Sequence, residues 1–146
     1  MEIIVEVRKM LITGTIFTGA KMLEGENAVA TVAVRDVAAA AGFYEKTLGL
    51  GKLESGEKSI LLFQSGSSKL IVYQSQFAGT NQATAVTWPV KDVAAVARDL
   101  KGRGVTFERY DFPNATYEGD VHVMGKRRAA WFKDPDGNIH AVVDKD

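Results

Sequence analysis

The chain carries one short pattern twice. Residues 34–39 read Val-Arg-Asp-Val-Ala-Ala and residues 90–95 read Val-Lys-Asp-Val-Ala-Ala, 56 positions later. In both copies a strand-like apolar run ends at an Asp that is placed to cap a helix. A second echo, Phe63 with Leu70 against Phe132 with Ile139, has an offset of 69, so the second copy contains an insertion. Two copies are too few for a solenoid, which needs about three repeats or more. They predict two modules packed around one shared cavity.

Composition narrows the class of protein. The chain has 146 residues, 46% of them hydrophobic, which suits one domain with its own core. Eighteen Lys and Arg balance eighteen Asp and Glu, so we expect neither nucleic acid nor an anionic membrane as a partner. There is no Cys, which excludes disulfides, thiolate nucleophiles and cysteine zinc sites. No apolar run reaches the roughly 18 to 20 residues that span a bilayer. We therefore expect a cytoplasmic protein.

The first copy predicts the order β-α-β-β-β. Its helix spans residues 37–47 behind the capping residue Asp36. Its apolar, β-rich runs predict strands at residues 28–34, 52–54, 59–64 and 69–74, the last two joined by a Gly-Ser turn.

The second copy predicts the same order. Its helix spans residues 93–101 behind Asp92, and its strands are expected at residues 84–90, 105–111, 128–133 and 138–144. The insertion, residues 112–126, contains Pro113, Gly119 and Gly125. A loop of about 15 residues in a compact domain is often a lid, so we expect it to cover a site.

The predicted fold class is α+β: two tandem βαβββ modules that form a curved, partly open mixed sheet around a shared cavity. A single domain would span residues 28–146, with module one at 28–76, a linker at 77–82 and module two at 83–146. Residues 1–27 have no counterpart in the second copy. Alternation in residues 2–7 and an apolar run in 11–17 predict an appended strand or hairpin. The first 21 residues are either a native extension or an over-long start.

Two motifs resemble a known family. Residues 43–50 read Phe-Tyr-Glu-Lys-Thr-Leu-Gly-Leu, and residues 130–138 read Ala-Trp-Phe-Lys-Asp-Pro-Asp-Gly-Asn. Together they resemble the vicinal oxygen chelate superfamily, which includes glyoxalase, bleomycin-resistance proteins and extradiol dioxygenases, over residues 28–146. Both motifs have structural explanations: the first is one face of an amphipathic helix, and residues 134–138 form a tight turn whose Asp and Asn side chains bond neighbouring backbone.

The resemblance implies a divalent metal held by His or Glu side chains on the first and last strands of each module. Those positions fall on Val29, Ile71, Ala85 and Ala141, and none of these side chains can bind a metal. A slip of one residue brings in only His140, and one imidazole does not make a metal site. We therefore expect no metal and no cofactor. By strand alternation His140 should face the helices and be structural.

The insertion holds the other histidine. Glu118, Asp120 and His122 alternate there, which is compatible with a metal cluster or with His122 as a general base. A solvated loop of ordinary polar residues is the alternative. No other pattern for nucleophilic catalysis is present, so catalytic residues are not assigned.

Strand phase predicts where a ligand would bind. Side chains that point to the same side of the strands as the four apolar residues at the family's metal positions should line the shared cavity. The insertion should close over that cavity. The predicted ligand-binding residues are Tyr73, Thr87, Glu108, Tyr110, His122 and Trp131.

A mostly apolar lining with few polar groups suits a small, partly apolar or aromatic organic molecule. The leading prediction is non-catalytic binding of such a molecule, with antibiotic sequestration as in similar metal-free members of the superfamily. The alternative is a lyase, isomerase or oxygenase of the same superfamily, with His122 or Glu108 in the chemistry. A dimeric scaffold is a third reading, and we expect a homodimer.

Overall fold

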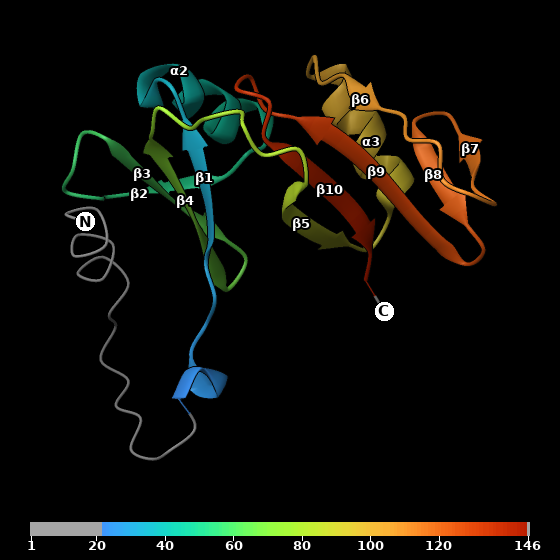
Figure 1. Cartoon of the computed structure of the whole chain (residues 1–146), viewed down its shortest axis with the longest axis horizontal. Coiled ribbons are helices and arrows are strands. Elements are labelled where there is room, and N and C mark those ends of the chain that lie inside the picture. Colours follow the sequence, from blue (N-terminus) through green and yellow to red (C-terminus); the bar gives the residue numbers. More distant parts are fainter. Residues whose placement is uncertain (1–21, 146) are drawn as a thin grey trace.

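The computed structural model describes residues 22–145, and they form two modules that lie side by side (Figure 1). Module one contains the 3-10 helix η1 (Met22–Gly25), β1 (Ala30–Val34), α2 (Val37–Gly42), the π-helical turn η2 (Phe43–Thr47), β2 (Gly51–Leu53), β3 (Ile60–Ser65) and β4 (Ser68–Gln74). Module two contains β5 (Thr84–Val90), α3 (Val93–Gly102), β6 (Phe107–Glu108), β7 (Thr116–Glu118), β8 (Val121–Met124), β9 (Arg127–Lys133) and β10 (Ile139–Asp144). The hairpin predicted within residues 2–17 lies outside the described residues.

Each module has its own open, mixed sheet. The first has the strand order β1-β4-β3-β2, and the second has the order β5-β10-β9-β8-β7 with β6 also paired to β9. β1 runs parallel to β4, and β5 runs parallel to β10. The predicted α+β class with two βαβββ modules is confirmed. The structure resolves the expected curved sheet into two, because β1 and β5 are neighbours without forming a ladder.

The repeated Asp is the helix cap in both modules. Asp36 Oδ1 accepts hydrogen bonds from the backbone N–H of Ala38 and Ala39, at 2.9 and 3.4 Å. Asp92 Oδ1 accepts one from the N–H of Ala95 at 3.0 Å. These bonds satisfy backbone donors that a helix start leaves without an intrahelical partner. The sequence echo therefore marks two equivalent strand-to-helix joins.

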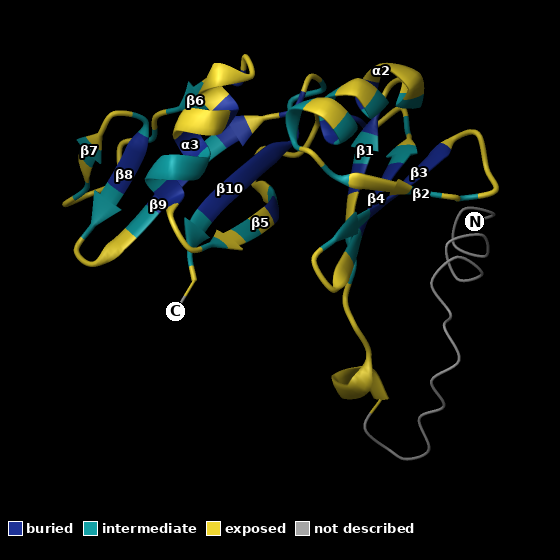
Figure 2. Ribbon diagram, turned by 180° about the vertical axis from the view of Figure 1, so that it is seen from behind, coloured by how far each residue is buried: buried dark blue, intermediate teal, exposed yellow. Residues whose placement is uncertain are grey.

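Each helix covers one face of its sheet, and the buried residues gather between them (Figure 2). In module one this core comprises Val32, Val34, Ala40, Tyr44, Leu61, Phe63, Leu70, Val72 and, from β5, Val86. In module two it comprises Val93, Ala97, Leu100, Val105, Val121, Ala130, Phe132 and Val142. Because strand side chains alternate, the residues between these point to the opposite side, called here the open face of each sheet.

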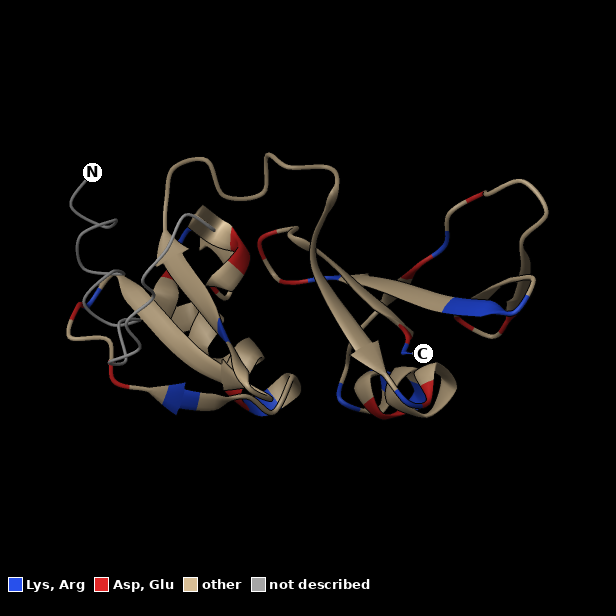
Figure 3. Ribbon diagram, turned by 90° about the horizontal axis from the view of Figure 1, so that it is seen from below, with Lys and Arg blue, Asp and Glu red and all other residues tan. Residues whose placement is uncertain are grey.

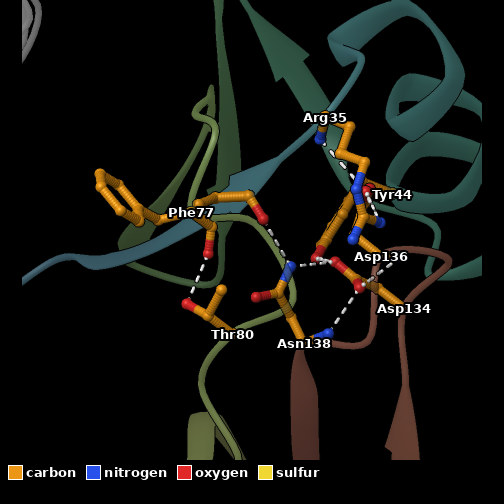
Figure 4. A network of polar contacts seen from close by, with 8 residues as sticks. Arg35, Tyr44, Phe77, Thr80, Asp134, Asp136 and Asn138 are labelled. Carbon is orange, nitrogen blue, oxygen red and sulfur yellow. Dashed lines mark hydrogen bonds and ion pairs between the residues drawn. The ribbon is translucent and has the colours of Figure 1, made fainter.

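The turn between β9 and β10 joins the two modules (Figure 4). Asp134 accepts four hydrogen bonds: Oδ1 from the N–H groups of Asp136 and Asn138, and Oδ2 from the Tyr44 hydroxyl at 2.7 Å and the Asn138 amide at 2.8 Å. The Asn138 amide also donates to the carbonyl of Ala33 at 2.7 Å. The predicted tight turn, with side chains bonded to neighbouring backbone, is confirmed.

The linker packs directly against this turn. Gly79 has φ +74°, and a Cβ there would lie 2.3 Å from the carbonyl oxygen of Asp136. Glycine is therefore required at this position both by the backbone angle and by the close approach. Asp136 also connects the turn to module one. Its Oδ1 accepts hydrogen bonds from the backbone N–H and the guanidinium of Arg35, at 3.1 and 3.2 Å.

His140 lies on the helix side of its sheet, as strand alternation predicts. Its ring is fully buried and stacks on Phe132, with centroids 5.0 Å apart. Trp88 Nε1 donates to His140 Nδ1 at 3.0 Å, so the proton of the neutral imidazole is on Nε2, 3.1 Å from the Tyr44 hydroxyl oxygen. Burial lowers the pKa of His140 to about 4, while nearby Asp134 acts in the opposite direction. The imidazole is therefore neutral at pH 7.

The prediction that the insertion is a loop is wrong. It contains the β7–β8 hairpin, in which Glu118 pairs with Val121 around a two-residue turn. A second such turn joins β8 to β9, where Met124 pairs with Arg127. Gly119 and Gly125 begin these turns at φ +61° and +62°. Glycine in that position gives a tight turn whose twist matches the strands.

The predicted strand at residues 105–111 is reduced to Phe107–Glu108, because the chain then leaves the edge of β9 to reach the hairpin. Charged residues of both signs are interspersed over the two modules (Figure 3). Within residues 22–145 there is no helix with the length and hydropathy needed to cross a bilayer.

Candidate functional site

The open face of module two gathers side chains from five strands. Pairing between β9 and β10 places Trp131 beside Ala141, and pairing with β5 places Thr87 on the other side of Ala141. Glu108 on β6 lies beside Trp131. His122 on β8 lies opposite Ala129, two residues along β9 on the same face.

Five rings meet on this face, and they are called here the aromatic cluster: Tyr110, Phe112, Tyr117, His122 and Trp131. His122 is at its centre, with its ring centroid 4.9 Å from those of both Tyr117 and Trp131 in edge-to-face arrangements. Tyr110 and Phe112 lie 5.5 and 5.4 Å from Trp131. His122 is 0% exposed, whereas Phe112 is 39% exposed. Aromatic pairs in such geometries are stabilising beyond the area they bury.

Hydrogen bonds hold the segment after β6 against the hairpin. The N–H of Tyr110 donates to His122 Nε2 at 2.9 Å, and the Tyr117 hydroxyl donates to the carbonyl of Tyr110 at 2.6 Å. The Arg109 guanidinium lies 4.2 Å above the Tyr117 ring and donates to the carbonyl of Gly119 at 2.9 Å. The backbone at Tyr110 is therefore fixed by the same histidine that its ring faces.

The bond to Tyr110 determines the tautomer of His122. Nε2 accepts a hydrogen bond, so in the neutral ring the proton is on Nδ1. Burial lowers the pKa of His122, and Arg109 acts in the same direction, while backbone groups of Tyr110, Ala129 and Asp120 oppose them. Two buried polar atoms, His122 Nδ1 and the Tyr110 hydroxyl oxygen, have no hydrogen-bond partner among residues 22–145.

The structure brings together four of the six predicted ligand-binding residues: Glu108, Tyr110, His122 and Trp131. Glu108 stands at the margin of the cluster, where Lys133 Nζ lies 3.6 Å from its carboxylate. Thr87 is on the same open face, exposed, and two strands from Trp131. Whether these residues contact a ligand stays a prediction.

Tyr73 is separate from the others. It is on the open face of module one, packed against a cluster of aliphatic side chains that comprises Ile60, Leu62 and Ile71, with Val29 and Leu53 beside it. The two sheets thus present different open faces, and the predicted lining residues divide between them.

Sequence reasoning missed Phe112, Tyr117 and Thr84. Thr84 Oγ1 accepts a hydrogen bond from Trp131 Nε1 at 3.3 Å. Tyr117 pairs with His122 across the hairpin. The hairpin that places Tyr117 was detectable in the sequence from the two Gly-X dipeptides that begin at Gly119 and Gly125. A Gly-X pair between alternating residues is typical of a two-residue β-turn.

The positions at which the family would hold a metal do not fit one. Ile71 and Ala141 do lie on open faces, but they carry no donor atom. The register of β5 against β10 shifts between Ile139 and His140, so Thr84 rather than Ala85 is on the open face. Val29 is part of the aliphatic cluster.

The Glu118, Asp120 and His122 pattern does not form a cluster either. Glu118 pairs with Arg128, and Asp120 pairs with Lys101 at 3.0 Å, so both carboxylates are directed away from the buried imidazole. In the described part of the chain no three His, Cys, Asp or Glu side chains are arranged to hold a metal ion.

A cavity of about 360 Å³ lies between the modules on the helix side of the sheets. Leu48 and Leu50 line it from module one, and Trp88, Leu100 and Val142 line it from module two. It is thus on the opposite side of the sheet from the aromatic cluster, and it is not the hollow that strand phase predicts.

Comparison with protein families matches residues 27–141 to the Glyoxalase/Bleomycin resistance protein/Dioxygenase superfamily. The chain belongs to this superfamily, as the two motifs indicate. A comparison with curated proteins found no match.

Solved structures show the same fold. A bleomycin resistance determinant encoded on the transposon Tn5 has a TM-score of 0.64 and 20% identity, over 83% of this chain and 98% of that one. The bleomycin-binding protein of Streptomyces verticillus, solved with copper(II)-bleomycin, has a TM-score of 0.64 and 23% identity, over 86% and 100%. Lactoylglutathione lyase from Agrobacterium tumefaciens has a TM-score of 0.61 and 17% identity, over 82% and 93%. At these identities the likeness concerns the fold alone.

Proposed function

We propose that the chain binds a small organic molecule with an aromatic or otherwise apolar ring at the aromatic cluster, and that it does so without catalysing a reaction. The observation that carries this proposal is the gathering of five rings on one sheet face, with Phe112 and Trp131 still partly exposed. Ring faces and edges supply contact area at low entropic cost, and a few polar groups orient what binds.

Two relatives of known structure are bleomycin-binding or bleomycin-resistance proteins. They support binding and sequestration of an antibiotic as the particular form of this function. The net charge of zero gives the whole molecule no attraction for a strongly cationic ligand such as bleomycin. The ligand we propose is therefore selected by its ring rather than by positive charge.

The superfamily also contains a lyase, but no contact in the described residues favours an enzyme here. The lone pair of His122 Nε2 is engaged by the Tyr110 N–H, so this nitrogen is not available as a general base. Glu108, the other residue considered for chemistry, lies beside Lys133. Both contacts fix side chains of the site in position, which suits a site that holds a ligand without reacting with it.

A homodimer remains part of the proposal. β2 is the outer edge strand of the first sheet, and Gly51 and Lys52 on it are exposed. Edge strands offer backbone groups to a second chain. Light scattering coupled to size-exclusion chromatography tests this: a mass of one chain across a concentration series would contradict it.

The binding proposal is tested by a thermal-shift screen of aromatic antibiotics and aromatic metabolites, followed by calorimetry on the hits. A ligand present at 100 times its Kd stabilises the folded state by about 2.7 kcal/mol, which is readily measured. Trp131→Ala should abolish the shift, whereas Tyr73→Ala, on the open face of module one, should leave it unchanged. Ligands whose affinity is unaffected by Trp131→Ala would place the site elsewhere.

A further inference from the structure

We infer that the molecule bound at the aromatic cluster carries an acceptor oxygen, a carboxylate or carbonyl attached to its ring, that receives hydrogen bonds from His122 Nδ1–H and from the Tyr110 hydroxyl. This inference rests on the proposed function and specifies the chemical class of its ligand. It starts from two atoms of the aromatic cluster that have no hydrogen-bond partner in the described part of the chain.

Buried polar side-chain atoms nearly always have a hydrogen-bond partner, so an exception needs an explanation. His122 Nδ1 and the Tyr110 hydroxyl oxygen are both buried, and no described residue forms a hydrogen bond with either atom. Both belong to one site, since the two ring centroids are 6.2 Å apart and each ring packs against Trp131. A pair of such atoms in one ring cluster indicates a place made for an outside group.

The chemistry of the missing group follows from the tautomer. Because Nε2 of His122 already accepts from the Tyr110 N–H, the free nitrogen is a donor. The Tyr110 hydroxyl can also donate. Two donors that lack an acceptor are satisfied by an oxygen with two lone pairs, which carbonyls and carboxylates possess and ammonium groups do not.

Neighbouring charges agree with an oxygen ligand. The Arg109 guanidinium lies over Tyr117 at the rim of the cluster. Glu108, the carboxylate adjacent to Trp131, lies 3.6 Å from Lys133 Nζ. A ligand carboxylate would therefore lie near the positive charge of Arg109. It would meet little repulsion from Glu108, because Lys133 compensates the charge of that carboxylate. Hydrogen bonds between neutral donors and a carboxylate are also stronger than those to a neutral acceptor.

Phe112 determines access to the two donors. Its ring contacts Tyr110, His122 and Trp131, with centroids 6.0, 5.9 and 5.4 Å apart, although it is 39% exposed. It lies outside the strands, in the segment between β6 and β7, and Asn114 two residues later has φ +64°. A ligand ring that takes the place of the Phe112 ring keeps the same aromatic contacts and brings its oxygen to the donors.

The test uses three naphthalene probes of similar shape: 2-naphthoate, 2-naphthylmethylamine and 2-methylnaphthalene, titrated by calorimetry and by NMR. His122→Gln keeps an acceptor for the Tyr110 N–H but has no donor at the Nδ1 position, and Tyr110→Phe keeps the ring without the hydroxyl. Tyr73→Phe removes a hydroxyl from the other open face and is the matched control. If His122→Gln does not fold, Tyr110→Phe still tests the acceptor oxygen, through the second of its two hydrogen bonds.

We expect the wild-type protein to prefer 2-naphthoate over both other probes by about tenfold or more, the effect of a hydrogen bond to a charged group. His122→Gln and Tyr110→Phe should each remove most of this preference without changing affinity for 2-methylnaphthalene, and Tyr73→Phe should change nothing. Long-range ¹H–¹⁵N spectra should show the His122 proton on Nδ1.

Two outcomes separate this inference from the proposed function. Binding of all three probes at the cluster with equal affinity, or a His122 proton on Nε2, would overturn the acceptor-oxygen inference and leave ring binding in place. Failure of every probe to bind at the cluster would overturn both.

Discussion

The open faces of the two modules differ in the kind of side chain that they gather. In module one this face is aliphatic, with Ile60, Leu62 and Ile71 almost fully buried. In module two it is aromatic and includes two buried polar atoms that have no hydrogen-bond partner among the residues described. The helix sides are alike, since each has an Asp-capped helix over a core of aliphatic and aromatic side chains. The duplicated frame is shared, and our proposal places ligand binding on only one of its two open faces.

The inserted hairpin produces much of this difference. Tyr117 and His122 come from β7 and β8, and Tyr110 lies in the segment that leads into them. Module one has no such element among its described residues, so its open face is completed by side chains from its own strands.

The largest effect should come from the turn that both modules share. Asp134→Ala leaves the Tyr44 hydroxyl and the Asn138 amide without their buried acceptor. We expect the free energy of unfolding to fall by about 3 to 5 kcal/mol, measured by urea denaturation. Asp136→Ala, in the same turn, removes a pair with the exposed Arg35 and should lower it by less than about 1 kcal/mol. Equal losses would mean that the network does not join the modules.

The second prediction concerns pH. The folded-state pKa of His140, about 4, is below the ordinary value of 6.5, so the unfolded chain binds more protons between these values. The stability that His140 contributes is complete above pH 6.5 and is lost as the pH falls towards 4, by about 3 kcal/mol. Denaturation at a series of pH values checks this. His140→Gln should flatten the curve in that window; an unchanged slope would assign the dependence to other groups.

The third prediction contrasts the two open faces directly. Ile71→Ala in module one should lower the free energy of unfolding by about 2 to 3 kcal/mol, because the side chain is 1% exposed, and should not affect ligand affinity. Trp131→Ala in module two should lower stability less, because Trp131 is partly exposed, and should abolish binding. Calorimetry and urea denaturation of both variants would show it. Loss of binding in Ile71→Ala would make the two faces one site.

The smallest effect is expected at the turns. Gly119→Ala and Gly66→Ala place a side chain at φ +61° and +57° with no atom within 4 Å of the added Cβ, so each should lower stability by about 1 kcal/mol. Only Gly119→Ala should also weaken ligand binding, because its turn carries Tyr117 and His122. Equal effects of the two variants on binding would remove the hairpin from the site.

Features that depend on neighbouring residues were predictable from the sequence. The caps at Asp36 and Asp92 and the turn at residues 134–138 are each specified within a few positions, and the repeat then gave the module order. Strand alternation also placed His140 on the helix side.

Features that depend on distant packing were not predictable. Pro113 and the glycines of the insertion favoured a loop, although the glycines begin hairpin turns. Strand alternation correctly predicted which face of its sheet Tyr73 is on. It did not predict that Tyr73 and Trp131 belong to two separate sheets. The tautomer of His122 depends on a hydrogen bond from the Tyr110 N–H, twelve residues away in the sequence. No local sequence pattern reveals that bond.

The hairpin has one more consequence, for the behaviour of the chain at high concentration. β6 pairs with only one half of the outer edge of β9, and β8 pairs with the other half. Without the hairpin, that half would offer unpaired backbone groups to strands of other molecules, the usual start of intermolecular sheet growth. The hairpin moves the exposed edge outward to β7, which is three residues long and ends in a glutamate paired with Arg128. Short, charged edges resist such pairing, so we expect the hairpin, which supplies two of the five rings of the aromatic cluster, to disfavour aggregation as well.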